Sequence, residues 1–237
     1  MNREIINTII LATSFLALFG LAELIYHLFK VRAELTRKLV HFGTGILTLL
    51  FPILLDNHWL VLFLCGSFAL ILILSLKFNL LKSINAIDRK SYGSISYPLA
   101  VYLCYLAYDF YRPENYFNGK RYIIFYLPIL ILAICDPIAA LTGKRWQIGK
   151  YTLSGESKTF MGSSMFFISA FLLSCFMFLN MNYENSIYQI ILASLVISII
   201  TTITEAFSKK GLDNLFIPMS GILSLYIINE TLLYMSY

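Results

Sequence analysis

Ile5–Phe29 reads IINTIILATSFLALFGLAELIYHLF and contains no Asp, Lys or Arg and a single Glu, Glu23. A transmembrane helix needs about 20 mostly apolar residues. The run is also longer than the apolar core of a cleavable signal peptide. We therefore expect this segment to be retained and to cross a bilayer as a helix.

The composition of the whole chain is typical of a membrane protein. Of 237 residues, 59% are hydrophobic and 13% are charged, whereas a soluble domain has about 25% charged residues. A compact domain of this size cannot hide so much apolar surface from water. The composition thus excludes a soluble enzyme, a disordered chain and a disulfide scaffold. The four cysteines all lie within apolar runs, which favours burial over disulfides or zinc.

Seven further apolar runs follow, which predicts about eight transmembrane helices in all. The expected spans are Ile5–Phe29, Leu39–Leu55, Trp59–Leu76, Ile95–Tyr108, Tyr122–Thr142, Thr159–Leu179, Ile187–Thr204 and Leu215–Met235. Pro128 and Pro137 predict a kink or break near the end of the fifth span. The expected fold is an all-α polytopic membrane bundle, and residues 1–237 are expected to form a single integral membrane catalytic domain.

The basic residues alternate between the two sides of this topology. Of the 18 lysines and arginines, 14 fall between spans one and two, three and four, five and six, or seven and eight. The other four are Arg3, Arg112, Lys120 and Arg121. The positive-inside rule places the larger group in the cytoplasm. Both termini are then expected outside.

The stretch from Asp136 to Thr159 combines features of an anion-binding site. A carboxylate within an apolar span, such as Asp136, is costly and usually functional. Glycines let backbone N–H groups approach phosphate oxygens, and lysine and arginine contribute charge. The stretch contains Gly143, Lys144, Arg145, Gly149, Lys150, Gly155 and Lys158. The alternative is a basic loop that fixes topology and contacts anionic lipid. The stretch does not have Walker A spacing, and Tyr151 follows Gly149–Lys150 where Ser or Thr would stand.

Three other clusters map to the same side of the membrane. Glu34, Arg37, Lys38 and His41 are spaced to share one helix face. Glu205 ends the seventh span, and Asp213–Asn214 is suited to hold hydrated Mg²⁺. The alternative is a helix-loop-helix turn with Gly211 as the helix stop and Asp213 as the next N-cap, which is compatible with a metal role. The segment 88–93 is a weaker cluster.

Taken in order, these stretches resemble the polyprenol kinase family, which includes dolichol kinase, phytol kinase and CTP-dependent diacylglycerol kinases. The resemblance covers about residues 34–220 and lies in Arg37-Lys38-Leu39-Val40-His41, Ser91-Tyr92-Gly93, Asp136 with Ala139, Gly143, Gly149 and Lys150, Lys158-Thr159, and Glu205 with Gly211, Asp213, Asn214 and Pro218. Met161 stands where the family has an acid. Any metal or base role of that acid would be absent here or moved, as to Glu156.

The resemblance implies a kinase that transfers the γ-phosphoryl of a nucleoside triphosphate, with CTP as the co-substrate, to an isoprenoid alcohol or diacylglycerol at the cytoplasmic face. Asp136, Lys158, Glu205 and His41 are the expected catalytic residues. Nucleotide binding is expected of Arg37, Lys38, Gly143, Lys144, Arg145, Gly149, Lys150 and Gly155. Asp136, Asp213 and Asn214 are the expected Mg²⁺ ligands.

Two other functions remain open at this point. A cytidylyltransferase that makes a CDP-lipid would use the same anion clamp. An ion-coupled transporter would place its acids near the middle of the bilayer. The expected partners are the lipid alcohol, the nucleotide and the bilayer, with no nucleic acid. The lipid and the oligomeric state are left open.

Overall fold

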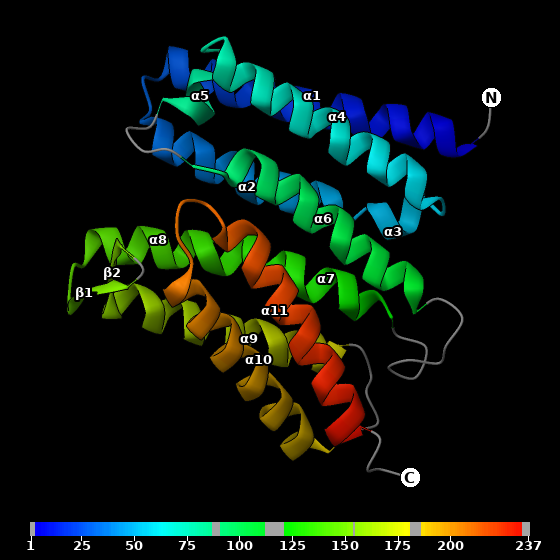
Figure 1. The fold of residues 1–237 in the computed structure, drawn as a ribbon, viewed down its shortest axis with the longest axis vertical. Helices are drawn as coiled ribbons and strands as arrows, with labels where there is room; N and C mark the ends of the chain where they lie inside the picture. The colour runs from blue at the N-terminus through cyan, green and yellow to red at the C-terminus, as the bar shows by residue number, and fades with distance from the viewer. Residues whose placement is uncertain (1–2, 87–90, 112–120, 154, 181–185, 234–237) are drawn as a thin grey trace.

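The computed structural model describes residues 3–86, 91–111, 121–153, 155–180 and 186–233. These residues form α-helices, two π-helical turns and one hairpin (Figure 1). The elements are α1 (Arg3–Leu28), α2 (Ala33–Thr48), α3 (Phe51–Leu54), α4 (His58–Lys77), α5 (Lys82–Asn85), α6 (Gly93–Phe110), α7 (Tyr122–Leu130), η2 (Ile131–Cys135), α8 (Asp136–Arg145), β1 (Lys150–Leu153), β2 (Glu156–Thr159), α9 (Phe160–Asn180), α10 (Ile187–Phe207), α11 (Asp213–Ile228) and η3 (Asn229–Leu233).

Within the described part of the chain, 6 helical segments are long and apolar enough to cross a membrane. They are Arg3–Phe29, Ala33–Leu54, His58–Lys77, Tyr122–Arg145, Phe160–Asn180 and Ile187–Phe207. The expected fold with several membrane-spanning helices is therefore confirmed, whereas the count of eight is not. The fourth and eighth expected spans form α6 and α11, which are not among the six. Tyrosines and serines lower the hydropathy of α6, and α11 has only 16 residues. The expected end of the last span, at Met235, lies outside the described residues.

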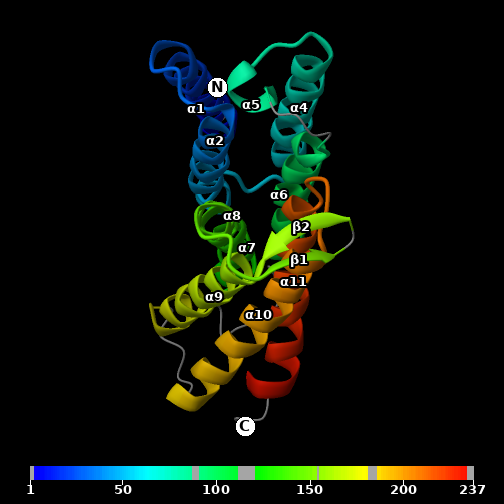
Figure 2. The same ribbon diagram turned by 90° about the vertical axis from the view of Figure 1, so that its left-hand side faces the viewer.

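Two apolar cores lie on either side of the rod formed by α7, η2 and α8. One core contains residues of α1, α2, α3, α4, α6 and α7. The other contains residues of α7, η2, α8, α9, α10 and α11. In the apolar stretch of this rod 72% of the residues are buried, whereas in the other candidate spans the buried share is 28–33%. Figure 2 shows this rod between α1, α2 and α4 at one end of the long axis and α9, α10 and α11 at the other. Exposed apolar side chains such as Phe63 and Leu172 cover the outer helices, as expected of surfaces that contact lipid.

The rod continues through both prolines, so of the expected kink or break the break is not found, and the helix is instead irregular just before Pro137. A π-helical turn, Ile131–Cys135, precedes Asp136 directly, and Pro137 occupies the first turn of α8. Pro137 has no N–H to donate to the preceding turn, and a π turn is one way for a helix to continue past such a defect. The turn also lies against α2, because a Cβ on Gly45 would be 2.3 Å from the Cβ of Ala133.

The loop between α8 and α9 contains a two-stranded antiparallel hairpin that the all-α expectation did not include. Lys150 is opposite Thr159 and Tyr151 is opposite Lys158. Gly155 lies in the turn with φ +81°, a backbone conformation that favours glycine. The hairpin brings Lys150 and Lys158 onto adjacent strands, which the spacing in the sequence alone does not reveal.

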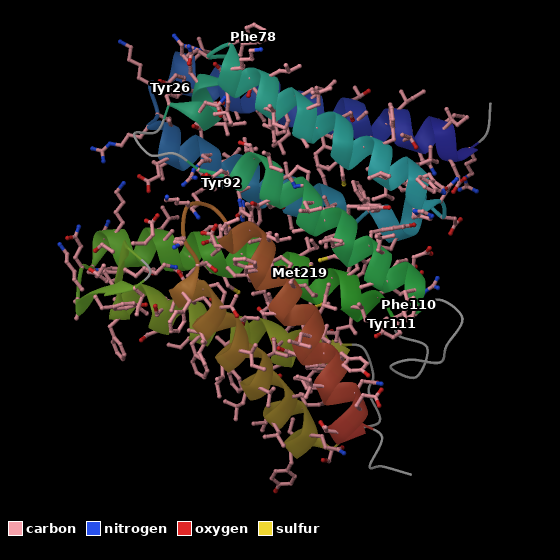
Figure 3. The ribbon with its side chains drawn as sticks, viewed as in Figure 1. Tyr26, Phe78, Tyr92, Phe110, Tyr111 and Met219 are labelled. Atoms are coloured by element: carbon pink, nitrogen blue, oxygen red, sulfur yellow. The ribbon has the colours of Figure 1, made fainter. Side chains whose placement is uncertain are left out.

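The polar loops gather at one end of the helices. In Figure 1 the end of α8, the hairpin and α5 lie at the left, while α1 begins and α11 ends toward the right. Figure 3 shows Tyr26 and Phe78 toward the first end and Phe110 and Tyr111 toward the second. Aromatic side chains near both ends are typical of helices that meet the two membrane interfaces. Arg89, Lys90, Arg112 and Lys120, which contribute to the predicted topology, lie outside the described residues.

Candidate active site

Asp136 and Lys38 form a buried ion pair between α8 and α2. Lys38 Nζ lies 2.5 Å from Asp136 Oδ2, although the residues are 98 positions apart. Only 13% of the Lys38 side chain and 8% of the Asp136 side chain are exposed. Buried charges persist when they are paired and hydrogen-bonded, since either charge alone would carry a large desolvation penalty. The pair thus fixes a carboxylate and a cation at one point.

His41 contacts the π-helical turn that precedes Asp136. Its Nε2 lies 3.0 Å from the Leu132 carbonyl oxygen and 3.9 Å from Asp136 Oδ2. A carbonyl oxygen only accepts a hydrogen bond, so Nε2 must carry the proton in this contact. The geometry therefore gives His41 a positioning contact with the turn, next to the carboxylate.

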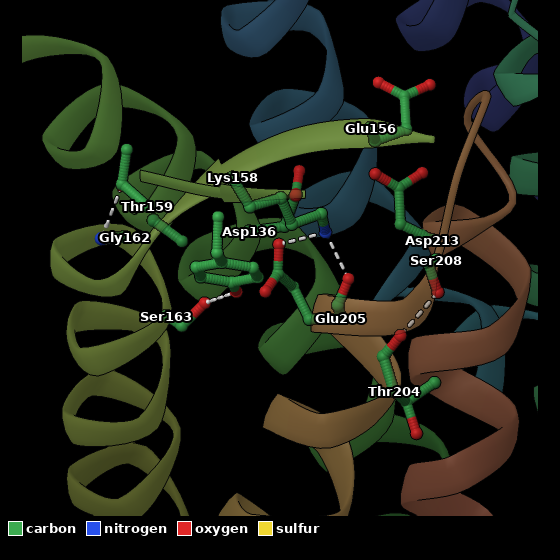
Figure 4. Close-up of polar contacts among 12 residues, drawn as sticks. Asp136, Glu156, Lys158, Thr159, Gly162, Ser163, Thr204, Glu205, Ser208 and Asp213 are labelled. Carbon is green, nitrogen blue, oxygen red and sulfur yellow. Dashed lines mark hydrogen bonds and ion pairs between the residues drawn. The ribbon is translucent and has the colours of Figure 1, made fainter. Parts of the chain in front are cut away.

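Lys158 and Glu205 form a second buried pair, between β2 and the end of α10. Lys158 Nζ donates to the Glu205 backbone carbonyl and to Oε1, the latter at 2.5 Å (Figure 4). Among the described residues, Glu205 Oε2 is buried and has no hydrogen-bond partner. A buried carboxylate oxygen without a partner is costly unless a ligand contacts it. Glu205 thus contacts the hairpin through Lys158 and leaves one buried carboxylate oxygen without a hydrogen-bond partner in the described part of the chain.

Asp213 and Asn214 begin α11 next to the loop from Ser91 to Gly93. Asn214 N donates to Asp213 Oδ1 at 3.0 Å, and Tyr92 N donates to the Lys210 carbonyl at 2.7 Å. Burial raises the pKa of Asp213, and the negative charge of Asp136 raises it further. Asp213 is therefore a carboxylate that a nearby cation would stabilise.

Gly211 allows these two loops to approach each other. Its φ is +82°, and a Cβ there would lie 2.4 Å from Ser91 Oγ. The loop from Ser91 to Gly93 is also the one that the resemblance singled out.

A polar cavity of about 360 Å³ lies between α2, α8, the hairpin and the loop before α11. Its charged lining residues are Glu34, Arg37, Lys38, Asp136, Lys144, Lys150, Glu156, Lys158, Glu205, Lys209, Lys210 and Asp213. Lys144 pairs with Glu34 at its edge. Lys150, Lys209 and Lys210 form no ion pair with any described residue. These three lysines are available to a polyanion.

An apolar cavity of about 520 Å³ lies on the other side of the Lys38–Asp136 pair. Side chains of α1, α2, α4 and α6 line it, many of them aromatic or aliphatic, while His41 and Asn214 contribute polar groups. The two cavities share Arg37, Lys38, Asp136, Gly211 and Asp213 as lining residues. A molecule in each cavity would therefore meet the other at this junction.

Most of the predicted site residues are brought together, and three are not. Arg37, Lys38, Asp136, Gly143, Lys144, Lys150, Lys158, Glu205 and Asp213 line the polar cavity, while His41 and Asn214 line the apolar one. The guanidinium of Arg145 instead lies 5.4 Å from the ring centroid of Trp146. Gly149 packs against Phe160, and Gly155 lies in the hairpin turn. Neither of these glycines lines the polar cavity.

Gly143 has a packing role that the sequence did not indicate. A Cβ at this position would be 2.6 Å from Thr159 Oγ1 and 3.2 Å from Gly162 Cα, so the glycine allows α8 and α9 to approach closely. Sequence reasoning also missed Lys209 and Lys210 as cavity residues, having counted them only toward topology. Their place between Glu205 and Asp213 was the available signal.

Glu156 lines the polar cavity, where its Oε1 accepts a hydrogen bond from Lys210 N at 3.2 Å. This places a carboxylate in the cavity although Met161 stands at the family's acid position. That Glu156 replaces the acid stays a prediction.

One comparison with known proteins identifies a relative. The chain is 32% identical over 203 residues to a protein of Synechocystis sp. described as phytol kinase. The aligned region covers 85% of this chain and 82% of the relative. No protein-family model matches the chain, and no solved structure matches it. Identity at this level over most of both proteins, together with the ordered motifs, shows that the chain belongs to the polyprenol kinase family, the family of phytol kinase.

Proposed function

We propose that this protein is a membrane lipid-alcohol kinase. It transfers the γ-phosphoryl of a nucleoside triphosphate, CTP by resemblance, to the hydroxyl of a lipid alcohol. One observation carries the proposal: a polar cavity and an apolar cavity meet at Lys38, Asp136 and Asp213. The relative described as phytol kinase supports the same class of reaction.

The polar cavity suits the nucleotide triphosphate. Lys150, Lys209 and Lys210 have no described carboxylate partner, and phosphate oxygens form strong charge-assisted hydrogen bonds with such groups. Phosphoryl transfer depends mainly on positioning and on neutralising the charge of the phosphates. The lysines therefore have the chemistry that a triphosphate site needs, whereas a lone lipid phosphate would not require this many cations.

Carboxylates of the polar cavity fit a Mg²⁺ ion that arrives with the nucleotide. No group of three or more His, Cys, Asp and Glu side chains in the described part of the chain could hold a metal alone. Mg²⁺ usually takes only one or two carboxylates and completes its coordination with phosphates and water. Asp213 and the unpartnered oxygen of Glu205 suit such a site. Bound there, the ion would neutralise charge on the phosphates.

The chemical step follows from the position of Asp136. The lipid hydroxyl reaches the junction from the apolar cavity, and its proton passes to the Asp136 carboxylate. The hydroxyl oxygen attacks the γ-phosphorus as the bond to the β–γ bridging oxygen breaks, which releases the nucleoside diphosphate. Lys38 holds the Asp136 carboxylate in place through its 2.5 Å contact. Lys158, fixed by Glu205, is placed to stabilise charge on the transferred group.

We infer that this site faces the cytoplasm. The polar cavity lies at the end of the bundle that carries the predicted cytoplasmic loops, including Lys150 and Lys209. The positive-inside rule supports this orientation.

Product analysis tests the proposal directly. Purified protein is incubated with Mg²⁺, with a panel of lipid alcohols or, separately, with the corresponding lipid monophosphates, and with CTP labelled at either the α or the γ phosphorus. We expect γ label in the lipid and release of CDP. Release of pyrophosphate with α label in the lipid would instead show a cytidylyltransferase. Protein that is folded but transfers neither label to any lipid alcohol would refute the kinase, and ion flux in liposomes would then favour a transporter.

A further inference from the structure

Three phenylalanine rings form the deep end of the apolar cavity. Phe15 of α1, Phe51 of α3 and Phe68 of α4 are buried and line the cavity. The ring centroid of Phe15 lies 6.0 Å from that of Phe51 and 4.9 Å from that of Phe68. We call these three residues the phenylalanine cluster. On α2 lining residues extend from Lys38 to Thr48, and Phe51 of the cluster follows in α3, so we infer that the cluster lies toward the end of the cavity away from the Lys38–Asp136 pair.

The cavity follows α2 from the junction toward the cluster. Its lining residues on this helix run from Arg37 to Thr48, which corresponds to about 16 Å at 1.5 Å per residue. A lipid hydroxyl placed at Asp136 would therefore direct its chain along α2 toward Phe51.

Packed side chains close the space behind the phenylalanine cluster. Leu11, Leu55 and Leu64 are each 1% exposed, and they belong to the same core as the cluster. Tyr105 is buried there, and its hydroxyl donates to the Leu55 carbonyl at 2.6 Å. Because protein interiors are packed as densely as organic crystals, a chain that passed the cluster would have to displace these side chains.

The volume of the cavity limits the size of the chain. An apolar protein cavity of about 150 Å³ holds benzene, or about 25 Å³ for each carbon atom. On that scale the apolar cavity of about 520 Å³ holds about 20 carbon atoms. The two acyl chains of a diacylglycerol, with about 36 carbons, would need about 900 Å³.

We propose that the phenylalanine cluster sets the chain length of the acceptor, so that the enzyme phosphorylates a single isoprenoid chain of up to about 20 carbons in preference to diacylglycerol or a long polyprenol. This inference rests on the proposed kinase function. Because the hydroxyl is fixed at the junction, the end of a longer acceptor chain would clash with the phenylalanine rings. A hydrophobic pocket separates ligands that differ by one methylene by roughly 10- to 200-fold, so a whole extra isoprene unit should be rejected at least this strongly.

Two substitutions in the cluster should shift the preference in opposite directions. Phe68→Ala removes a ring from the deep end, and we expect its kcat/KM with prenols of 25 and 30 carbons to rise at least about 10-fold. Phe51→Trp adds bulk there, and we expect it to lose the 20-carbon prenol while retaining the 10-carbon one. The KM for CTP should stay within about twofold in both variants, because the rings lie far from the polar cavity.

Phe63→Ala is the matched control. Phe63 lies on the same helix as Phe68, but it is 67% exposed and does not line the apolar cavity. Its prenol profile should equal that of the wild type. If Phe68→Ala unfolds, Phe68→Leu makes a smaller change with the same expected direction.

Binding without nucleotide separates this inference from the kinase proposal. Thermal protection by prenols of 10 to 30 carbons should be greatest near 20 carbons in the wild type and at a longer chain in Phe68→Ala. An unchanged chain-length profile in both cluster variants, by rate and by thermal protection, would overturn the inference even if the protein is a kinase. Conversely, a shifted protection profile without phosphorylated product would leave the length limit standing and refute the kinase.

Discussion

The Lys38–Asp136 pair offers a way to separate a structural contact from a catalytic one. Asp136→Asn retains the shape of the side chain and one oxygen that accepts from Lys38, but it removes the negative charge. Lys38 is then a buried cation, with a side chain only 13% exposed and no carboxylate at 2.5 Å. Breaking one partner of a buried pair costs about 3–5 kcal/mol. We expect a loss of stability toward the lower end of that range, because the amide oxygen still accepts a hydrogen bond.

A second substitution should restore stability without restoring activity. Lys38→Met combined with Asp136→Asn removes both charges and keeps an apolar side chain of similar length. Replacing a buried pair with apolar groups is often neutral or stabilising by about 1–4 kcal/mol. The melting temperature of the double variant should therefore return toward that of the wild type. Its kinase rate should remain about 10²–10³ lower, which corresponds to roughly 3–4 kcal/mol of lost electrostatic stabilisation in the transition state.

The assay is a double-mutant cycle measured both by thermal unfolding in one detergent and by the rate of CDP formation at saturating CTP and lipid. The structural control is the pair Lys144 and Glu34, an exposed contact at the edge of the polar cavity. Glu34→Gln should change the melting temperature little, since exposed pairs contribute about 0–1 kcal/mol. Near-wild-type rates in Asp136→Asn, or in the double variant, would refute the assignment of Asp136 as the base.

Three further outcomes are expected. Lys150→Ala should chiefly raise the KM for CTP, because a contact with the phosphates of bound CTP is the same in the ground state and the transition state. Lys158→Ala should lower kcat, because charge on the transferred group changes in the transition state. Kinetics with varied CTP and varied lipid test both roles, and a change in the lipid KM alone in both variants would contradict them. Gly211→Ala should lower the melting temperature by several degrees, since its φ is +82° and the new Cβ would meet Ser91 Oγ; an unchanged melting curve would show that the loop rearranges freely. Cysteine tags placed at Lys150 should react with an impermeant reagent only from the cytoplasm and tags at Asn57 only from outside; labelling of both from one side would disprove the topology.

The helices could be predicted because each depends on local sequence. Runs such as Ile5–Phe29 contain too few charges to lie in water, and the bias of lysine and arginine follows the order of the loops. The hairpin was missed because Lys150–Leu153 and Glu156–Thr159 are four residues each, with mostly polar side chains. The prolines predicted a kink or break here, but the π-helical form of the irregularity was not predicted, since the sequence does not show the contacts of α2 with the continuous helix.

The sequence predicted most residues of the candidate site but did not predict which of them form ion pairs with each other. The sequence places Asp136 and Lys38 on one side of the membrane, yet nothing in their spacing of 98 residues predicts an ion pair. The roles of the glycines were the least accessible. Gly143 and Gly155 were both assigned to phosphates, but Gly143 also lets α8 approach α9 closely, and Gly155 lies in the turn of the hairpin. A glycine next to lysines can bind phosphate, allow two helices to pack closely or adopt a positive φ in a turn. The sequence does not distinguish these roles, whereas the packing does.

The arrangement of the two cavities around the α7–η2–α8 rod has a consequence for divergence among relatives. Among the described residues, none from α1 or α4 lines the polar cavity, whereas both helices line the apolar one. Substitutions in α1 and α4 can therefore alter the lining of the apolar cavity without changing a residue that lines the polar one. Acceptor preference can therefore change through α1 and α4 while the residues of the polar cavity, including those of α2 between them, stay the same, and enzymes for different alcohols can arise from one ancestor in this way.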